Sequence, residues 1–185
     1  KLMLTSAGNG LDPTKIKAIS LVVDDVLTTS TAAGTINVTT MGTHFEPPVT
    51  VTTAAVMNLT THQPIIQPLK PCSVNQNPCT TGATLNTVTN FIQNSKDQFD
   101  FTYNLANGVT GAGDFRKFAG TTFNFQSPAV TLTNLTDTNP FVIGLKGTGT
   151  TKLKLVFEDT AGKQVTTQIS GLTSTNQNFQ VTKLM

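Results

Sequence analysis

The chain has 185 residues and a formal net charge of +2 at pH 7, and only 12% of its residues are charged. This charge balance does not indicate the strongly basic surface that is typical of nucleic-acid-binding proteins. No apolar run approaches the roughly 18 residues that a membrane-spanning helix needs. Threonine contributes 36 residues and asparagine 15, which favours polar, uncharged strand surfaces because threonine is β-branched.

The first fifteen residues are expected to form an N-terminal arm, followed by a single domain over residues 16–185. Leu2, Met3 and Leu4 make a short apolar segment, and a Ser/Gly/Asn tether follows it. Such a segment can fold back onto its own sheet, or it can add as a donor strand to the sheet edge of a neighbouring copy. Both alternatives stay open.

Alternation of apolar and polar residues is the dominant pattern of the chain and predicts strands. It is cleanest over residues 99–105, where every second residue is Phe, Tyr or Leu. Gly162 lies where a hairpin turn needs a positive φ, between the strands 152–158 and 164–170. At most one helical turn is expected, near residues 113–118. The other predicted strands cover residues 16–23, 35–40, 49–57, 85–92, 121–126, 129–133, 141–146 and 178–184.

About ten short strands without a sustained helical stripe predict an all-β fold, specifically a jelly-roll β-sandwich with an N-terminal extension. The eleven phenylalanines are expected to supply most of the bulk between the two sheets.

Cys72 and Cys79 lie seven residues apart, each preceded by proline and separated by polar turn formers. This pattern favours a disulfide-closed loop, which would stabilise the domain by about 2–3 kcal/mol. A disulfide would place the protein outside the cytosol, as a secreted or cell-surface protein. Free thiols are the main alternative. A zinc site would need His44 and His62 to converge on the same loop, and neither has ligand spacing.

Three Asn-x-Thr triplets begin at Asn37, Asn58 and Asn134. They are glycosylation acceptors where the machinery exists, but chance occurrence is the favoured interpretation in a chain this rich in Asn and Thr.

Calcium is the best candidate for a structural metal, because hard cations take several oxygen ligands. Asp24 and Asp25 are adjacent, and repel one another unless they are solvated or metal-bound. Asp97 is the third candidate ligand, with Asp100 and Asp114 nearby in sequence. Solvation without metal is the alternative.

No catalytic set is apparent. The two histidines lie in predicted loops, and the sequence has no Gly-x-Ser-x-Gly motif for a nucleophilic serine. No pair of carboxylates lies in a motif that would place it across a substrate cleft. Phosphate-binding glycine loops are absent from the sequence. The chain is therefore not expected to be an enzyme.

From about residue 99 onward the chain resembles the galactose-binding-like jelly roll of many carbohydrate-binding modules. The resemblance is carried by segments 99–105, 113–118, 141–149, the hairpin 152–169 and residues 179–181. It implies a sandwich fold, a structural calcium and sugar binding through exposed Trp or Tyr. The chain departs from that pattern, because it has no Trp and its one Tyr alternates with core-facing Phe residues.

Low charge, threonine-rich strands, an apolar arm and the absence of a catalytic set predict a structural subunit of an extracellular filament, tube or surface assembly. It would polymerise with itself through strand addition, because uncharged sheet edges are poorly protected. Secreted fibre-forming and tube-forming subunits, some calcium-dependent, look similar in these general ways. A non-catalytic carbohydrate-binding module with glycan partners is the alternative, and an adhesin or coat protein would share the same fold.

Overall fold

The computed structural model describes residues 10–24, 33–42, 65–69, 82–87, 99–104, 118–125, 129–132, 135–136, 140–150, 152–182 and 184. Within these ranges the chain forms ten strands and no helix, so the expected all-β class is confirmed. A helix that could span a membrane is therefore not found in the described part of the chain.

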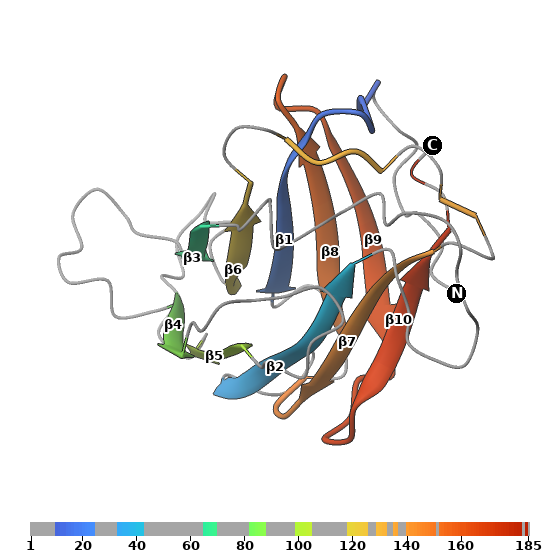
Figure 1. Cartoon of the computed structure of the whole chain (residues 1–185). Helices are drawn as coiled ribbons and strands as arrows, with labels where there is room; N and C mark the ends of the chain where they lie inside the picture. Colours follow the sequence, from blue (N-terminus) through green and yellow to red (C-terminus); the bar gives the residue numbers. More distant parts are fainter. Residues whose placement is uncertain are drawn as a thin grey trace, which may run out of the picture.

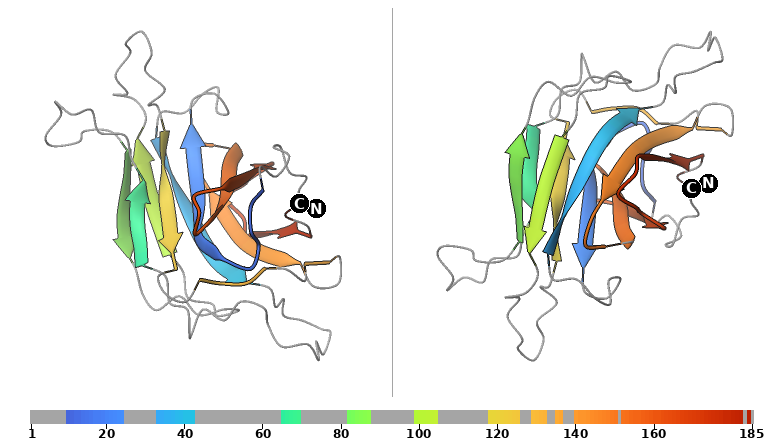
Figure 2. Two further views of the ribbon diagram at one scale, coloured as in Figure 1. Left: turned by 90° about the horizontal axis from the view of Figure 1, so that it is seen from above. Right: turned by 90° about the horizontal axis from the view of Figure 1, so that it is seen from below.

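The strands form two five-stranded antiparallel sheets that face each other as a β-sandwich (Figures 1 and 2). Sheet A contains, in spatial order, β3 (Ile65–Leu69), β6 (Phe118–Asn124), β1 (Ile16–Asp24), β8 (Lys152–Asp159) and β9 (Gln164–Ser170). Sheet B contains β10 (Gln177–Val181), β7 (Phe141–Gly147), β2 (Ala33–Gly42), β5 (Phe99–Asn104) and β4 (Gly82–Thr87).

The strand pairs are nested along the chain. β1 pairs with β8, β2 with β7, β3 with β6 and β4 with β5, and successive pairs alternate between sheet A and sheet B. This is the path of one long hairpin wound around a sandwich, as in a jelly roll. β9 and β10 extend the two sheets beyond β8 and β7.

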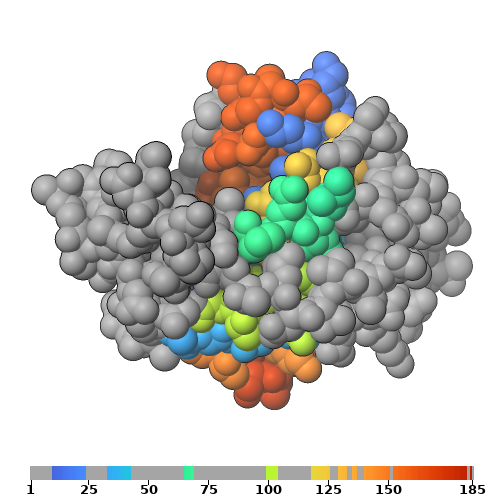
Figure 3. Space-filling view, turned by 90° about the vertical axis from the view of Figure 1, so that its left-hand side faces the viewer, coloured from blue at the N-terminus to red at the C-terminus, as the bar shows by residue number. Residues whose placement is uncertain are grey.

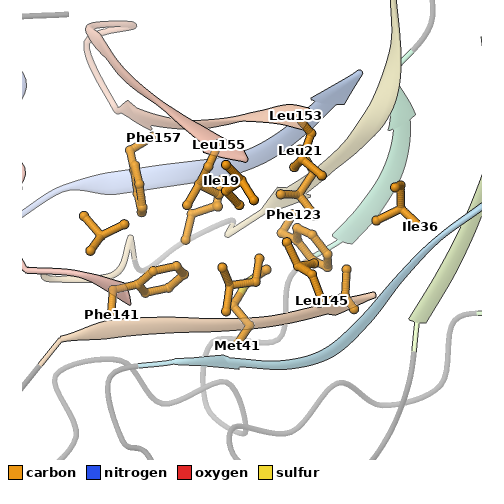
Figure 4. Packing of buried hydrophobic residues seen from close by; sticks show 14 of the residues in the cluster. Ile19, Leu21, Ile36, Met41, Phe123, Phe141, Leu145, Leu153, Leu155 and Phe157 are labelled. Carbon is orange, nitrogen blue, oxygen red and sulfur yellow. The ribbon is translucent and has the colours of Figure 1, made fainter. Parts of the chain in front are cut away.

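Among the described residues, the core between the sheets contains six phenylalanines and eighteen Leu, Ile and Val side chains, so aliphatic residues supply most of its bulk and the expectation of a mainly phenylalanine core is wrong. Phe141 of sheet B and Phe157 of sheet A meet edge to face, with ring centroids 5.3 Å apart (Figure 4). Phe99 and Phe123 form a second such contact between the sheets, at 5.4 Å. Edge-to-face packing is a preferred geometry for aromatic rings, so these two pairs fix how the sheets lie against each other.

Three local predictions differ from the structure. β3 was not expected, because Ile65 and Ile66 are adjacent apolar residues and Pro68 argues against a strand interior. The predicted strand 129–133 reduces to one bridge between Ile16 and Val130. Phe118 begins β6 instead of ending a helical turn. The predicted strand 49–57 lies outside the described residues.

The two sides of the sandwich differ. On one side β3 of sheet A contacts β4 of sheet B. Figure 3 shows β3 at the surface there, between atoms of sheet A above and of β5 below. On the other side the sheets end in β9 and β10 (Figure 1).

Candidate functional site

Most of the residues predicted to form sites lie outside the described residues. This applies to Leu2, Met3, Leu4, Asp25, His44, Asn58, His62, Cys72, Cys79, Asp97 and Asn134. Asp24 is the last residue of β1, and only its backbone is described. Among the described residues, no group of three or more His, Cys, Asp or Glu side chains is placed to hold a metal ion.

The described end of the expected arm is anchored to the sandwich. Leu11 is 3% exposed and belongs to the hydrophobic core. The Pro13 carbonyl accepts a hydrogen bond from Leu132 N at 2.7 Å, and the Lys15 carbonyl accepts one from Thr160 N at 3.0 Å. Residues 11–15 therefore pack against the rest of the domain, beside the turn that joins β8 to β9.

Asp159 holds this anchor together. Its side chain is 1% exposed, and Oδ2 accepts a hydrogen bond from Asp12 N at 2.9 Å. Oδ1 accepts two more, from Ala161 N at 2.8 Å and Lys163 N at 2.9 Å. These backbone donors lower the pKa of Asp159 below its ordinary value, and the hydrogen bond from Asp12 N has the largest effect.

Sequence reasoning placed Asp159 only within a turn and missed this anchoring role. Aspartate at the first position of a turn is a recognised signal for side-chain capping of the turn. The turn itself follows the prediction, because Gly162 has a φ of 79°.

Asn37 of β2, one of the triplet asparagines, is buried in the folded domain. It is 7% exposed, it lies between β5 and β7 in the middle of sheet B, and its Nδ2 donates a hydrogen bond to Asp100 Oδ1. The nitrogen that would carry a sugar is therefore engaged within the sheet.

Tyr103 is part of the core and not a sugar-stacking platform. Its side chain is 2% exposed, and its hydroxyl donates to the Thr148 carbonyl at 3.2 Å. Burial raises the pKa of Tyr103 to about 12. Among the described residues, Ile65 at 45% is the only exposed large hydrophobic side chain.

The strands that end the two sheets differ in how they are protected against pairing with another chain. β3 contains Pro68, and β4 has a register shift between Leu85 and Thr87. β9 and β10 contain no charged residue, no proline and no register shift. Proline, charge and bulges are the usual features that prevent a terminal strand from pairing with another chain. The described strands β9 and β10 have none of these features.

No protein-family model, no curated protein and no solved structure matches the chain.

Proposed function

We propose that the chain is a structural subunit of an extracellular filament, tube or surface assembly that polymerises through β-strand addition. The apolar segment Leu2–Leu4 of one copy would pair with a terminal strand of the next copy. Such a contact is head to tail, so it propagates instead of closing.

The observation that carries this proposal is the contrast between the two sides of the sandwich. Residues 164–170 and 177–181 end their sheets without charge, proline or bulge. Phe179 of β10 is only partly buried against the core. An added strand would cover part of this apolar ring and gain main-chain hydrogen bonds.

The anchor at residues 11–15 supports the same mechanism. It fixes the chain at Leu11 and Asp12, so residues 1–9 are attached to a defined point of the domain. Nine residues span at most about 30 Å when fully extended. This is long enough to reach a second copy that lies directly against the domain.

The test compares assembly of the full chain and of three variants by light scattering and electron microscopy. Deletion of residues 1–9 removes the proposed donor. The double variant Gln168→Lys/Asn178→Lys adds a charge to each unprotected terminal strand, at positions that alternate with inward-facing neighbours. Gln67→Lys in β3 is the matched control, because that strand already carries Pro68.

We expect filaments from the full chain and from Gln67→Lys, and folded monomers from the deletion and the double variant. Circular dichroism would verify that each variant keeps its β structure. A full chain that stays monomeric with and without calcium would contradict the proposal. So would filaments that persist unchanged in both the deletion and the double variant.

The carbohydrate-binding alternative is supported by the sandwich architecture alone. Sugar rings are normally held by exposed aromatic faces, and Tyr103 is buried. A glycan array probed with the monomeric deletion variant would decide: specific hits would favour this alternative, and their absence would leave it without support.

Secretion and calcium binding belong to the same proposal and have their own tests. A Cys72–Cys79 disulfide would appear as two thiols that react only after reduction. Calcium bound by Asp24, Asp25 and Asp97 would give heat in a calorimetric titration and a lower melting temperature with chelator. Reactive thiols would remove the argument for an oxidising location, and a flat titration would remove the metal.

A further inference from the structure

Three polar side chains form a row across the outer face of sheet B. The register places Asn37 of β2 opposite Lys146 of β7 on one side and opposite Asp100 of β5 on the other. Ile36 and Val38, which flank Asn37, lie in the core, so Asn37 faces outward with its two partners. Directly opposed residues have Cβ atoms about 4.5–5.5 Å apart.

The amide of Asn37 is held in a defined orientation. Its Nδ2 donates to Asp100 Oδ1, which turns the nitrogen toward β5. Because the amide group is planar, its carbonyl side is turned toward β7, the strand that carries Lys146. The residue is 7% exposed, so little water competes at the amide carbon.

We propose that Lys146 and Asn37 become joined by an isopeptide bond, with Asp100 as the group that assists departure of the amide nitrogen. The lone pair of Lys146 Nζ attacks Asn37 Cγ, and the attacking nitrogen passes one proton to Asn37 Nδ2. Asp100 Oδ1, which accepts the hydrogen bond from Nδ2, stabilises the positive charge that this proton brings to the leaving nitrogen. The Cγ–Nδ2 bond breaks, ammonia leaves, and one amide replaces another with no oxidant or further reagent.

A second lysine–carboxylate–amide set on sheet A lacks these features and serves as the comparison. Lys17 Nζ lies 2.6 Å from Glu158 Oε1, and Gln164 Nε2 donates to Glu158 Oε2 at 2.8 Å. Here the carboxylate contacts both the amine and the amide, and the amide residue Gln164 is exposed, whereas Asn37 is 7% exposed. This set is an ordinary solvated ion pair with an added hydrogen bond.

The test is the intact mass of the denatured and reduced full chain, together with a tryptic map. We expect the mass to be lower than the sequence mass by one ammonia. The peptide that contains Asn37 should be recovered covalently branched to the peptide that contains Lys146. Trypsin should also fail to cleave after Lys146, because its amine would no longer be charged.

Two variants and a control separate this bond from other losses of ammonia, such as succinimide formation at an Asn-Gly step. Lys146→Arg and Asp100→Ala should restore the full sequence mass, whereas Lys17→Arg should keep the loss of one ammonia. A wild-type map with unlinked peptides at Asn37 and Lys146 would overturn the proposal, and so would a loss that survives Lys146→Arg. The wild-type map decides even if a variant does not fold. The inference does not rest on the proposed function.

Discussion

Tyr103 and Asp159 show how burial and hydrogen bonding act in opposite directions on single groups. Burial disfavours the charged phenolate of Tyr103 and raises its pKa to about 12. Asp159 is equally buried, but three backbone N–H groups stabilise its charge, so its pKa is lowered. Both groups therefore make stability depend on pH, at opposite ends of the scale.

Tyr103 gives a spectroscopic prediction, because it is the only tyrosine and the chain has no tryptophan. Its pKa is higher in the folded state than the ordinary value of 10.0. The neutral phenol's contribution is thus fully present below pH 10.0 and is lost as the pH rises toward about 12. We expect the phenolate absorbance of the native protein to appear only near that upper value. Tyr103→Phe should abolish the signal and flatten the alkaline loss of stability, and a native titration near the ordinary value would contradict the assignment.

Asp159 gives the acid-side prediction. Its pKa is lower in the folded state than the ordinary value of 3.8, so its contribution is present above that pH and is lost as the pH falls through the folded pKa. Asp159→Asn should lower the denaturant midpoint at neutral pH and weaken the acid dependence of stability. Denaturant titrations across this pH range measure both effects. Equal midpoints for the two proteins at neutral pH would show that the anchor contributes nothing.

At the scale of strands, the contact between β7 and β8 across the core carries a measurable coupling. Phe141 and Phe157 are fully buried and meet edge to face at 5.3 Å. Each change to alanine should cost about 3–5 kcal/mol of unfolding free energy. A double-mutant cycle should give a coupling of about 0.5–1.5 kcal/mol. Strictly additive losses would show that the rings do not interact across the sheets.

Several strands were predictable from the sequence, because alternate residues of β5, β8 and β9 are buried and period-2 alternation follows directly. β5, β8 and β9 agree closely with the prediction. β3 could not be found this way, because its pairing with β6 and not its own pattern makes it a strand. The row of Asn37, Lys146 and Asp100 was equally hidden, since its members are far apart in sequence and only the register brings them together.

For the whole molecule, the anchor at residues 11–15 sets how much of the N-terminus can be removed. Deletion of residues 1–9 should leave a folded domain. Extending the deletion to residue 15 removes the buried Leu11 and the bond from Asp12 N to Asp159. Loss of the leucine side chain alone should cost about 2–5 kcal/mol. Thermal melts of the two truncations would compare them, and equal melting temperatures would show that the anchor is dispensable.

The nested pairing of strands also constrains when the protein can fold. β1 lies between β6 and β8, so neither of its partners exists before synthesis has passed Phe118, the first residue of β6. Contacts between such distant segments close slowly, and a nascent chain would expose β1 until β6 and β8 have been synthesised. Chains halted on the ribosome before residue 152 should therefore be cut readily by protease, whereas released chains that contain residues 1–185 should resist cleavage. Protease resistance of the halted chains would show that β1 folds without β8.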